Sequence, residues 1–291
     1  MTTARTGNGV QTVLITGASA GIGAAAATRM AEAGYRVFGA SRHPRPGADG
    51  VRMVRMDVRD DESVADAVAA VMGEAGRIDI VVNNAGIMLE AFAEETGRTE
   101  ADAVFETNFF GAIRVTNAVL PGMRRRRHGR IINVGSLAAW IGEPGEGIYS
   151  ASKAALARYT EALRHEVWHL GIHVSLIEPG AFTTGVLDAA SSHHPAERPI
   201  PDYDGPREAA RRTLHDSLRH GGDPRKVAEL ITSVAGARRP KARYGAGPEA
   251  RWVPLAKTLM PQHVADGLLR RAYHLPRRAP HRAGGRGAPE A

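Results

Sequence analysis

The chain reads VLITGASAGIG from Val13 to Gly23, a β-branched run followed by a glycine-rich turn and an Ala-rich stretch up to Ala33. A glycine motif gains meaning from this context, in which a strand precedes it and a helix follows it. Glycines let the backbone approach a pyrophosphate closely, and the helix N-terminus supplies unpaired N–H donors and a positive dipole. The stretch therefore predicts a nucleotide-binding turn rather than a plain tight turn.

Further short apolar runs follow this turn, and helix-like segments separate them. The runs are Arg36–Phe38, Val51–Val54, Ile80–Val82, Ile131–Val134 and Val174–Ile177. Near-continuous hydrophobic strands that alternate with helices predict a parallel sheet buried on both faces. The predicted fold class is α/β, a Rossmann-type doubly wound parallel sheet with helices on both faces.

Apolar spacings of three and four residues predict a long helix over Ala101–Arg127 and another that begins near Tyr149. Residues 183–207 are rich in Ser, His, Pro, Asp and Gly, which predicts an irregular loop over the substrate. Helices are expected at 207–219 and 224–235. One domain is expected over residues 8–275. Within it, 183–235 form the substrate loop and helices and 236–275 a C-terminal extension, and a disordered basic tail follows at 276–291.

Composition excludes several classes of protein. The 291 residues include no Cys, which excludes disulfides, iron–sulfur clusters, a thiolate nucleophile and cysteine zinc sites. No apolar run approaches the roughly 20 residues of a membrane span, and the polar N-terminus is unlike a secretory signal, so a cytoplasmic protein is expected. The net charge is +7, but six Arg and one Glu lie in residues 270–291, which indicates a solvated tail and no nucleic-acid surface. No metal site is expected, because His193-His194 lack carboxylates at ligand spacing.

The end of the second predicted strand bears on the choice of nicotinamide cofactor. Sites that prefer NAD usually carry an acidic residue about 20 positions after the turn, where it binds a ribose hydroxyl. Here the strand ends Gly39-Ala40-Ser41-Arg42 without a carboxylate. Arg42 can pair with a 2′-phosphate through two hydrogen bonds, which favours NADP(H) over NAD(H). The alternative is that Arg42, like nearby Arg45, is a solvated loop residue.

Three side chains suggest acid–base chemistry. Tyr149 and Lys153 are four residues apart near the start of a predicted helix, and therefore lie on one face. A nearby Lys⁺ favours the phenolate and should lower the pKa of Tyr149 from its ordinary value of about 10. Ser136 follows the 131–134 strand, at a carboxyl end where its hydroxyl can hold a substrate oxygen. Without Ser136, the Tyr–Lys pair would equally fit an ordinary surface pair.

These motifs together resemble the classical short-chain dehydrogenase/reductase (SDR) family, over about residues 10–190. They stand in the order usual for that family, and the thirteen-residue gap from Ser136 to Tyr149 is also its usual one. The matching residues are Thr16–Gly23, Asp57-Val58, Asn83–Gly86, Asn108, Ser136, Tyr149 with Lys153, and Pro179-Gly180 with Thr184.

The resemblance implies hydride transfer between a nicotinamide cofactor and a carbonyl or secondary alcohol, without a metal. Tyr149 would exchange a proton with the substrate oxygen, Ser136 would hydrogen-bond that oxygen, and Lys153 would hold the nicotinamide ribose. Asn108 would anchor a water in a proton relay. The expected cofactor-binding residues, Arg42 included, are Gly17, Ser19, Gly21, Ile22, Gly23, Arg42, Asp57, Val58, Asn84, Ala85, Gly86, Tyr149, Lys153, Pro179, Gly180, Phe182 and Thr184.

Residues 177–184 and the C-terminal extension resemble the hydroxysteroid and retinol dehydrogenase group more than they resemble the compact acyl-carrier reductases. This likeness suggests a ketone reductase for a bulky apolar substrate. The resemblance to the family as a whole implies a homodimer or homotetramer. Candidate pocket residues, each of which ordinary packing would explain equally well, are Met88, Trp140, Ile141, Phe182 and Leu187. One alternative is a 3-oxoacyl-carrier-protein-type reductase, and another is a non-catalytic nucleotide-binding regulator or scaffold.

Overall fold

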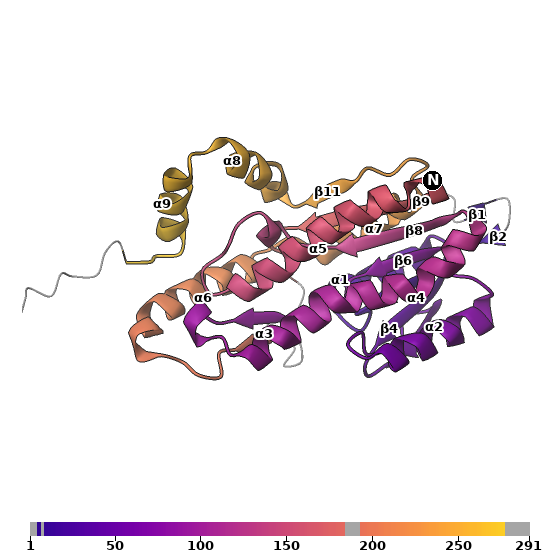
Figure 1. Cartoon of the computed structure of the whole chain (residues 1–291), viewed down its shortest axis with the longest axis horizontal. Helices are drawn as coiled ribbons and strands as arrows, with labels where there is room; N and C mark the ends of the chain where they lie inside the picture. Colours follow the sequence, from indigo (N-terminus) through magenta and orange to yellow (C-terminus); the bar gives the residue numbers. More distant parts are fainter. Residues whose placement is uncertain (1–4, 7–8, 184–192, 277–291) are drawn as a thin grey trace, which may run out of the picture.

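The computed structural model describes residues 5–6, 9–183 and 193–276, and its centre is a seven-stranded sheet (Figure 1). Neighbouring strands are all parallel, in the order β11-β9-β8-β6-β3-β4-β5. The strands are β3 (Thr12–Thr16), β4 (Arg36–Ser41), β5 (Val51–Arg55), β6 (Ile80–Asn83), β8 (Gly129–Val134), β9 (Ile172–Pro179) and β11 (Arg243–Ala246). All six predicted strands are confirmed, and β11 is an edge strand that the sequence did not predict.

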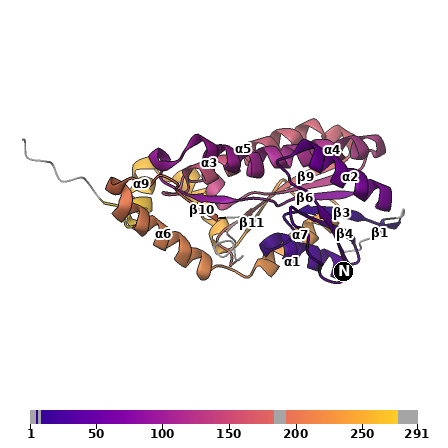
Figure 2. The same ribbon diagram turned by 90° about the horizontal axis from the view of Figure 1, so that it is seen from below.

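Helices cover both faces of the sheet (Figure 2). One face packs against α1 (Gly21–Glu32) and α7 (Pro224–Gly236), and the other against α2 (Asp61–Ala75), α4 (Gly111–Arg126) and α5 (Gly147–Glu166). Residues along β3 alternate between the two cores: Val13 and Ile15 belong to the first, and Leu14 belongs to the second. Both faces of the strand are therefore apolar, as a doubly wound α/β fold requires.

The strand order also positions the site. From β3 the chain continues outward through β4 and β5, and it then returns to the other side of β3 with β6. Such a switch point opens a crevice at the carboxyl ends of the two strands. Asn83 at the end of β6 and Thr16 at the end of β3 border this crevice.

The predicted helix over 101–127 is present, but it is not uniformly α-helical. It consists of α3 (Arg98–Phe105), a π-helical turn η2 (Glu106–Phe110) and α4, which follow one another without a break. Single π turns inside α-helices occur frequently at functional sites. Asn108, the predicted proton-relay residue, lies in this turn.

The predicted irregular loop over 183–207 is partly wrong. Residues 184–192 lie outside the described residues, but His193–Pro195 form a strand, β10, parallel to β7 (Met88–Glu90). A 3-10 turn η5 (Pro201–Tyr203) follows, and α6 (Asp204–Arg219) begins earlier than its predicted start. The sequence did not reveal β10 because a three-residue strand of His-His-Pro has no apolar pattern.

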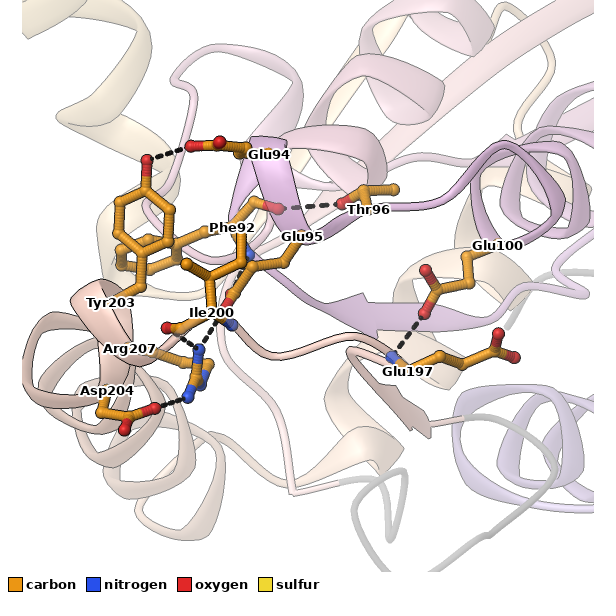
Figure 3. Close-up of polar contacts among 10 residues, drawn as sticks. All are labelled: Phe92, Glu94, Glu95, Thr96, Glu100, Glu197, Ile200, Tyr203, Asp204 and Arg207. Carbon is orange, nitrogen blue, oxygen red and sulfur yellow. Dashed lines mark hydrogen bonds and ion pairs between the residues drawn. The ribbon is translucent and has the colours of Figure 1, made fainter.

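Polar contacts hold the described part of this segment against η1 (Ala93–Glu95) and α3 (Figure 3). Glu95, which is 2% exposed, accepts a hydrogen bond from the Ile200 N–H at 2.8 Å and also pairs with Arg207. The Glu197 N–H donates to Glu100 at 3.0 Å. Buried and partly buried carboxylates therefore help to fix residues 196–207, alongside the apolar packing of Ala196 and the ring contact of Tyr203 with Phe92.

The C-terminal extension projects from the body of the molecule (Figure 1). After β11 come η6 (Pro248–Arg251), α8 (Val253–Leu259) and α9 (Gln262–Ala272), and Tyr273 after α9 is 9% exposed. The remaining elements are the antiparallel pair β1 (Arg5–Thr6) and β2 (Gly9–Val10), and the 3-10 turns η3 (Leu137–Ala139) and η4 (Trp168–Leu170). Among the described residues, no helix combines the length and the apolar character needed to cross a membrane.

Candidate active site

A cavity of about 800 Å³ lies at the carboxyl ends of β3, β4, β6 and β8. Most of the predicted site residues line it: Gly17, Ser19, Gly21, Ile22, Arg42, Asp57, Val58, Asn84, Ala85, Gly86, Ser136, Tyr149, Lys153, Pro179, Gly180 and Phe182. Gly23 and Asn108 are not part of the lining, and Thr184 lies outside the described residues. The structure thus brings motifs that are far apart in the sequence to one cavity.

Close backbone packing fixes the conformation of the glycine-rich turn. Gly17 and Gly21 have positive φ angles of 67° and 55°, which L side chains rarely adopt. A Cβ on Gly23 would lie 2.2 Å from the Gly17 carbonyl oxygen. The Asn84 side chain donates to the Thr16 carbonyl at 3.0 Å, so the β6 loop buttresses this turn. Gly23 and Asn84 therefore shape the turn that leads to the N-terminus of α1.

Two arginines, Arg42 and Arg59, also line the cavity. Arg42 directly follows β4, and its charge helps to lower the pKa of Asp57. The larger cause is Arg59, whose guanidinium donates to both carboxylate oxygens of Asp57, with Nη2–Oδ2 at 2.7 Å. Arg59 also lines the cavity, and sequence reasoning missed it. The sequence feature that could have indicated Arg59 is the short Asp57-Val58-Arg59 run after β5.

Three of the four predicted catalytic side chains, those of Ser136, Tyr149 and Lys153, line the far end of the cavity. Ser136 follows β8, and its hydroxyl hydrogen-bonds Tyr149 and accepts the Ala138 N–H at 3.1 Å. Lys153, 5% exposed, lies one helical turn after Tyr149 and donates from Nζ to the Val134 carbonyl at 3.1 Å. Its Nζ lies 5.7 Å from the centre of the Tyr149 ring. The Ser136 hydroxyl, the Tyr149 phenol and the Lys153 amine therefore lie at the same end of the cavity.

The pKa of Tyr149 differs from the prediction. Burial raises it above its ordinary value, the charges of Glu146 and Glu143 raise it further, and only the hydrogen bond from Ser136 lowers it. Lys153 is not among the groups that shift it, and burial lowers the pKa of Lys153 itself to about 8. Tyr149 therefore keeps its proton at neutral pH, which suits a general acid.

Asn108 has a structural role in the π turn. Its side chain is 1% exposed, donates to the Ile87 carbonyl at 2.9 Å and accepts the Ile87 N–H at 2.8 Å. It also donates to Ser152 at 3.1 Å. Both ends of the amide are therefore engaged with protein atoms, and Asn108 fixes the segment after β6 against α5.

The predicted substrate-pocket residues divide into three groups. Met88, Ile141 and Phe182 line the cavity. Trp140 does not, because its indole N–H donates to Glu178 at 2.9 Å and its ring packs against the Arg243 guanidinium. Leu187 lies outside the described residues.

Acidic and C-terminal residues that sequence reasoning missed also line the substrate end. Glu143 and Glu146 precede α5, and Tyr273 follows α9. The Tyr273 hydroxyl donates to Glu143 at 3.0 Å, so the C-terminal extension closes part of the cavity. No local sequence pattern marks these residues, since each comes from the end of an element.

The stability of the protein should fall with rising pH because of Glu146. Burial, and then the neighbouring Glu143 and Glu90, raise its pKa well above the ordinary 4.5, so the folded state holds the proton more tightly than the unfolded chain. This contribution is present below about pH 4.5 and is lost as the pH rises through the folded-state pKa. Glu146→Gln should therefore raise the Tm by several degrees at pH 8 and flatten its pH dependence. Differential scanning calorimetry against Glu166→Gln, an exposed acid on α5, tests this; equal pH profiles for both variants would contradict it.

The cavity fits a nicotinamide dinucleotide. The glycine-rich turn at the start of α1 suits a pyrophosphate, Arg42 and Arg59 lie at one end, and Tyr149 with Lys153 lie at the other. The substrate would occupy the remaining part, next to Ser136 and Tyr149.

Comparison with known proteins agrees with this geometry. The short chain dehydrogenase family model matches residues 11–195. A 3-ketodihydrosphingosine reductase from Bacteroides thetaiotaomicron is 36% identical over 271 residues, which cover 90% of this chain and 98% of the relative. Human retinol dehydrogenase 8 is 35% identical over 256 residues, or 80% of each chain. The crystal structure of a short-chain dehydrogenase from Streptomyces avermitilis superposes with a TM-score of 0.77 at 32% identity, covering 89% of this chain and 96% of the other.

Proposed function

Because this chain belongs to the short-chain dehydrogenase/reductase family of NAD(P)-dependent oxidoreductases, we propose that it reduces the carbonyl of a bulky apolar ketone with NADP(H). The observation that carries this proposal is the convergence of Ser136, Tyr149 and Lys153 at one end of the cavity that begins at the glycine-rich turn. When bound, the nicotinamide cofactor supplies the hydride.

The protein's own side chains donate the proton, bind the substrate oxygen and position the reactants. Tyr149, protonated at neutral pH, donates its proton to the oxygen of the substrate as negative charge develops there. Ser136 hydrogen-bonds the same oxygen, as an oxyanion donor does. Lys153, which also lines the cavity, would hold the nicotinamide ribose. Asn108 keeps the segment at Ile87 and the helix at Ser152 in register with them.

The substrate end of the cavity supports an apolar substrate. Its apolar lining comes from five separate parts of the chain: Met88, Leu137, Ile141, Phe182, Leu214, Leu218 and Val253. Two relatives are named for 3-ketodihydrosphingosine and retinol, and these substrates are the first to test. Consumption of NADPH with free apolar ketones supports the proposal. Activity on carrier-bound 3-oxoacyl thioesters alone would favour a carrier-protein reductase, and cofactor binding without turnover of any ketone would favour a non-catalytic role.

The preference for NADP(H) rests on Arg42. Replacing Arg42 by Ala should weaken NADPH binding by roughly 10- to 100-fold, the loss expected for a charge-assisted pair, and leave NADH binding nearly unchanged. Fluorescence titration of both cofactors measures this. Arg45→Ala, at an exposed position in the same loop, is the control and should bind both cofactors like the parent protein. Tighter binding of NADH than of NADPH by the parent protein would contradict the preference.

A further inference from the structure

Two carboxyl groups, those of Glu143 and Glu146, line the substrate end of the cavity, where the proposed reaction does not use them, and a third, that of Glu90, lies beside Glu146 in a neighbouring pocket. Glu90 ends β7, and Glu143 and Glu146 lie in the loop before α5. Glu146 is 2% exposed and Glu90 is 7% exposed. Glu143 and Glu146 hydrogen-bond each other, which requires a proton between them, and the charge of Glu90 acts on Glu146 as well.

A tyrosine hydroxyl and a histidine ring contact two of these carboxyls. The Tyr273 hydroxyl donates to Glu143 at 3.0 Å, and His215 Nε2 lies 2.8 Å from Glu90 Oε1. Glu146 Oε1 is buried without a hydrogen-bond partner among the residues that the structure describes. A buried carboxyl oxygen without a partner costs stability, so a fold that only needed packing would place an apolar residue there.

The position of the pair relates it to the reaction. Glu143 and Glu146 line the same cavity as Tyr149, and both charges raise the pKa of Tyr149. Glu146 immediately precedes α5 and stands three residues before Tyr149, about one helical turn away. A cation held by this pair would therefore lie close to the carbonyl that Tyr149 protonates.

We propose that Glu143 and Glu146 bind a protonated amine of the substrate, so that the ketone reduced by this enzyme is an amino ketone with its amine next to the carbonyl. This inference rests on the proposed function and names the substrate class for the same cavity. The ammonium replaces the proton that the two carboxyls share, and its N–H donors reach the oxygen that lacks a partner. The rest of the substrate packs against the apolar wall formed by Leu214, Leu218 and Val253.

An ammonium fits the pair better than a metal ion does. Within the described part of the chain, no group of three or more His, Asp or Glu has an arrangement that could hold a metal. Two carboxyls and a tyrosine hydroxyl at the substrate end of the cavity, next to the apolar residues Leu214, Leu218 and Val253, instead match the donors of a single ammonium.

The test compares three ketones of the same carbon skeleton with NADPH at neutral pH: an α-amino alkyl ketone, its N-acetylated form and the plain alkyl ketone. We expect kcat/KM to be roughly 10- to 100-fold higher for the amino ketone than for the N-acetylated form, the range for a charge-assisted hydrogen bond. Glu143→Gln and Glu146→Gln should each remove most of this preference. Glu166→Gln, with the same substitution at an exposed position of α5, should keep it.

A binding measurement separates this inference from the proposed function. The α-amino alcohol of the same skeleton should raise the Tm of the parent protein more than the plain alcohol does, and Glu143→Gln should abolish the difference. Reduction of the N-acetylated and amino ketones at equal kcat/KM would overturn the amine site and leave the ketone reductase intact. A preference that survives in both Gln variants would also overturn it. If no ketone were reduced, the proposed function would fail, and the Tm shift would still decide whether the carboxyls bind an amine.

Discussion

Replacing Tyr149 by Phe should lower kcat for ketone reduction by roughly 10³-fold, within the range that general acid–base catalysis contributes. The substitution removes one hydroxyl and leaves the ring against Lys153, so the fold and the cavity should persist. The dissociation constant for NADPH should therefore change by less than about threefold, because the glycine-rich turn and Arg42 lie at the other end of the cavity. Stopped-flow or steady-state assays with an apolar ketone, together with a fluorescence titration of NADPH, measure both quantities.

The matched control is Tyr159→Phe. Tyr159 lies on the same helix and is partly buried, and its hydroxyl hydrogen-bonds Thr116, outside the cavity. This variant should keep kcat within a few-fold of the parent value. If Tyr149→Phe retained most of the activity, the proton would come from another donor, and Tyr149 would be only a structural residue of α5.

Much of the fold followed from the sequence because five of the six predicted strands are largely buried on both faces, while the edge strand β5 is partly exposed. Such strands read as short apolar runs, and all six found in this way are present. Five strands were not predicted. Four of them, β1, β2, β7 and β10, have only two or three residues each, and the fifth, Arg243–Ala246, lies at the edge of the sheet and has a polar, partly exposed sequence. The long helix was predicted from its apolar spacing, whereas its π turn was not, since that turn depends on what Asn108 contacts across the fold.

The site was predictable where function requires a fixed local spacing. The glycine-rich turn and the Tyr149–Lys153 pair are each contiguous in sequence, and the structure brings both to the cavity. The pKa of Tyr149 was predicted with the wrong sign, because burial and the charge of Glu146 are properties of the folded chain. For the same reason the sequence did not reveal that Glu143, Glu146 and Tyr273, which come from a loop and the C-terminal extension, form one wall of the cavity.

The close packing of the glycine-rich turn predicts opposite effects for the same substitution at two glycines. Gly23→Ala should lower the free energy of unfolding by roughly 1–3 kcal/mol, the usual cost of overpacking, because its Cβ would lie 2.2 Å from the Gly17 carbonyl oxygen and 2.5 Å from Asn84 Nδ2. Both neighbours shape the pyrophosphate turn, so NADPH affinity should fall by at least about tenfold, the loss of one charge-assisted hydrogen bond or more.

Gly73 provides the counterpart inside α2. It is exposed, and a Cβ there would meet nothing within 4 Å, so Gly73→Ala should raise the free energy of unfolding by roughly 0.5–1 kcal/mol through helix propensity alone. NADPH affinity should not change, because α2 lies outside the cavity at this position. Urea denaturation and NADPH titration of the two variants measure both effects. A Gly23→Ala protein as stable and as tight for NADPH as the parent would show that the turn relaxes without loss, and that its glycines are not required for close approach to the pyrophosphate.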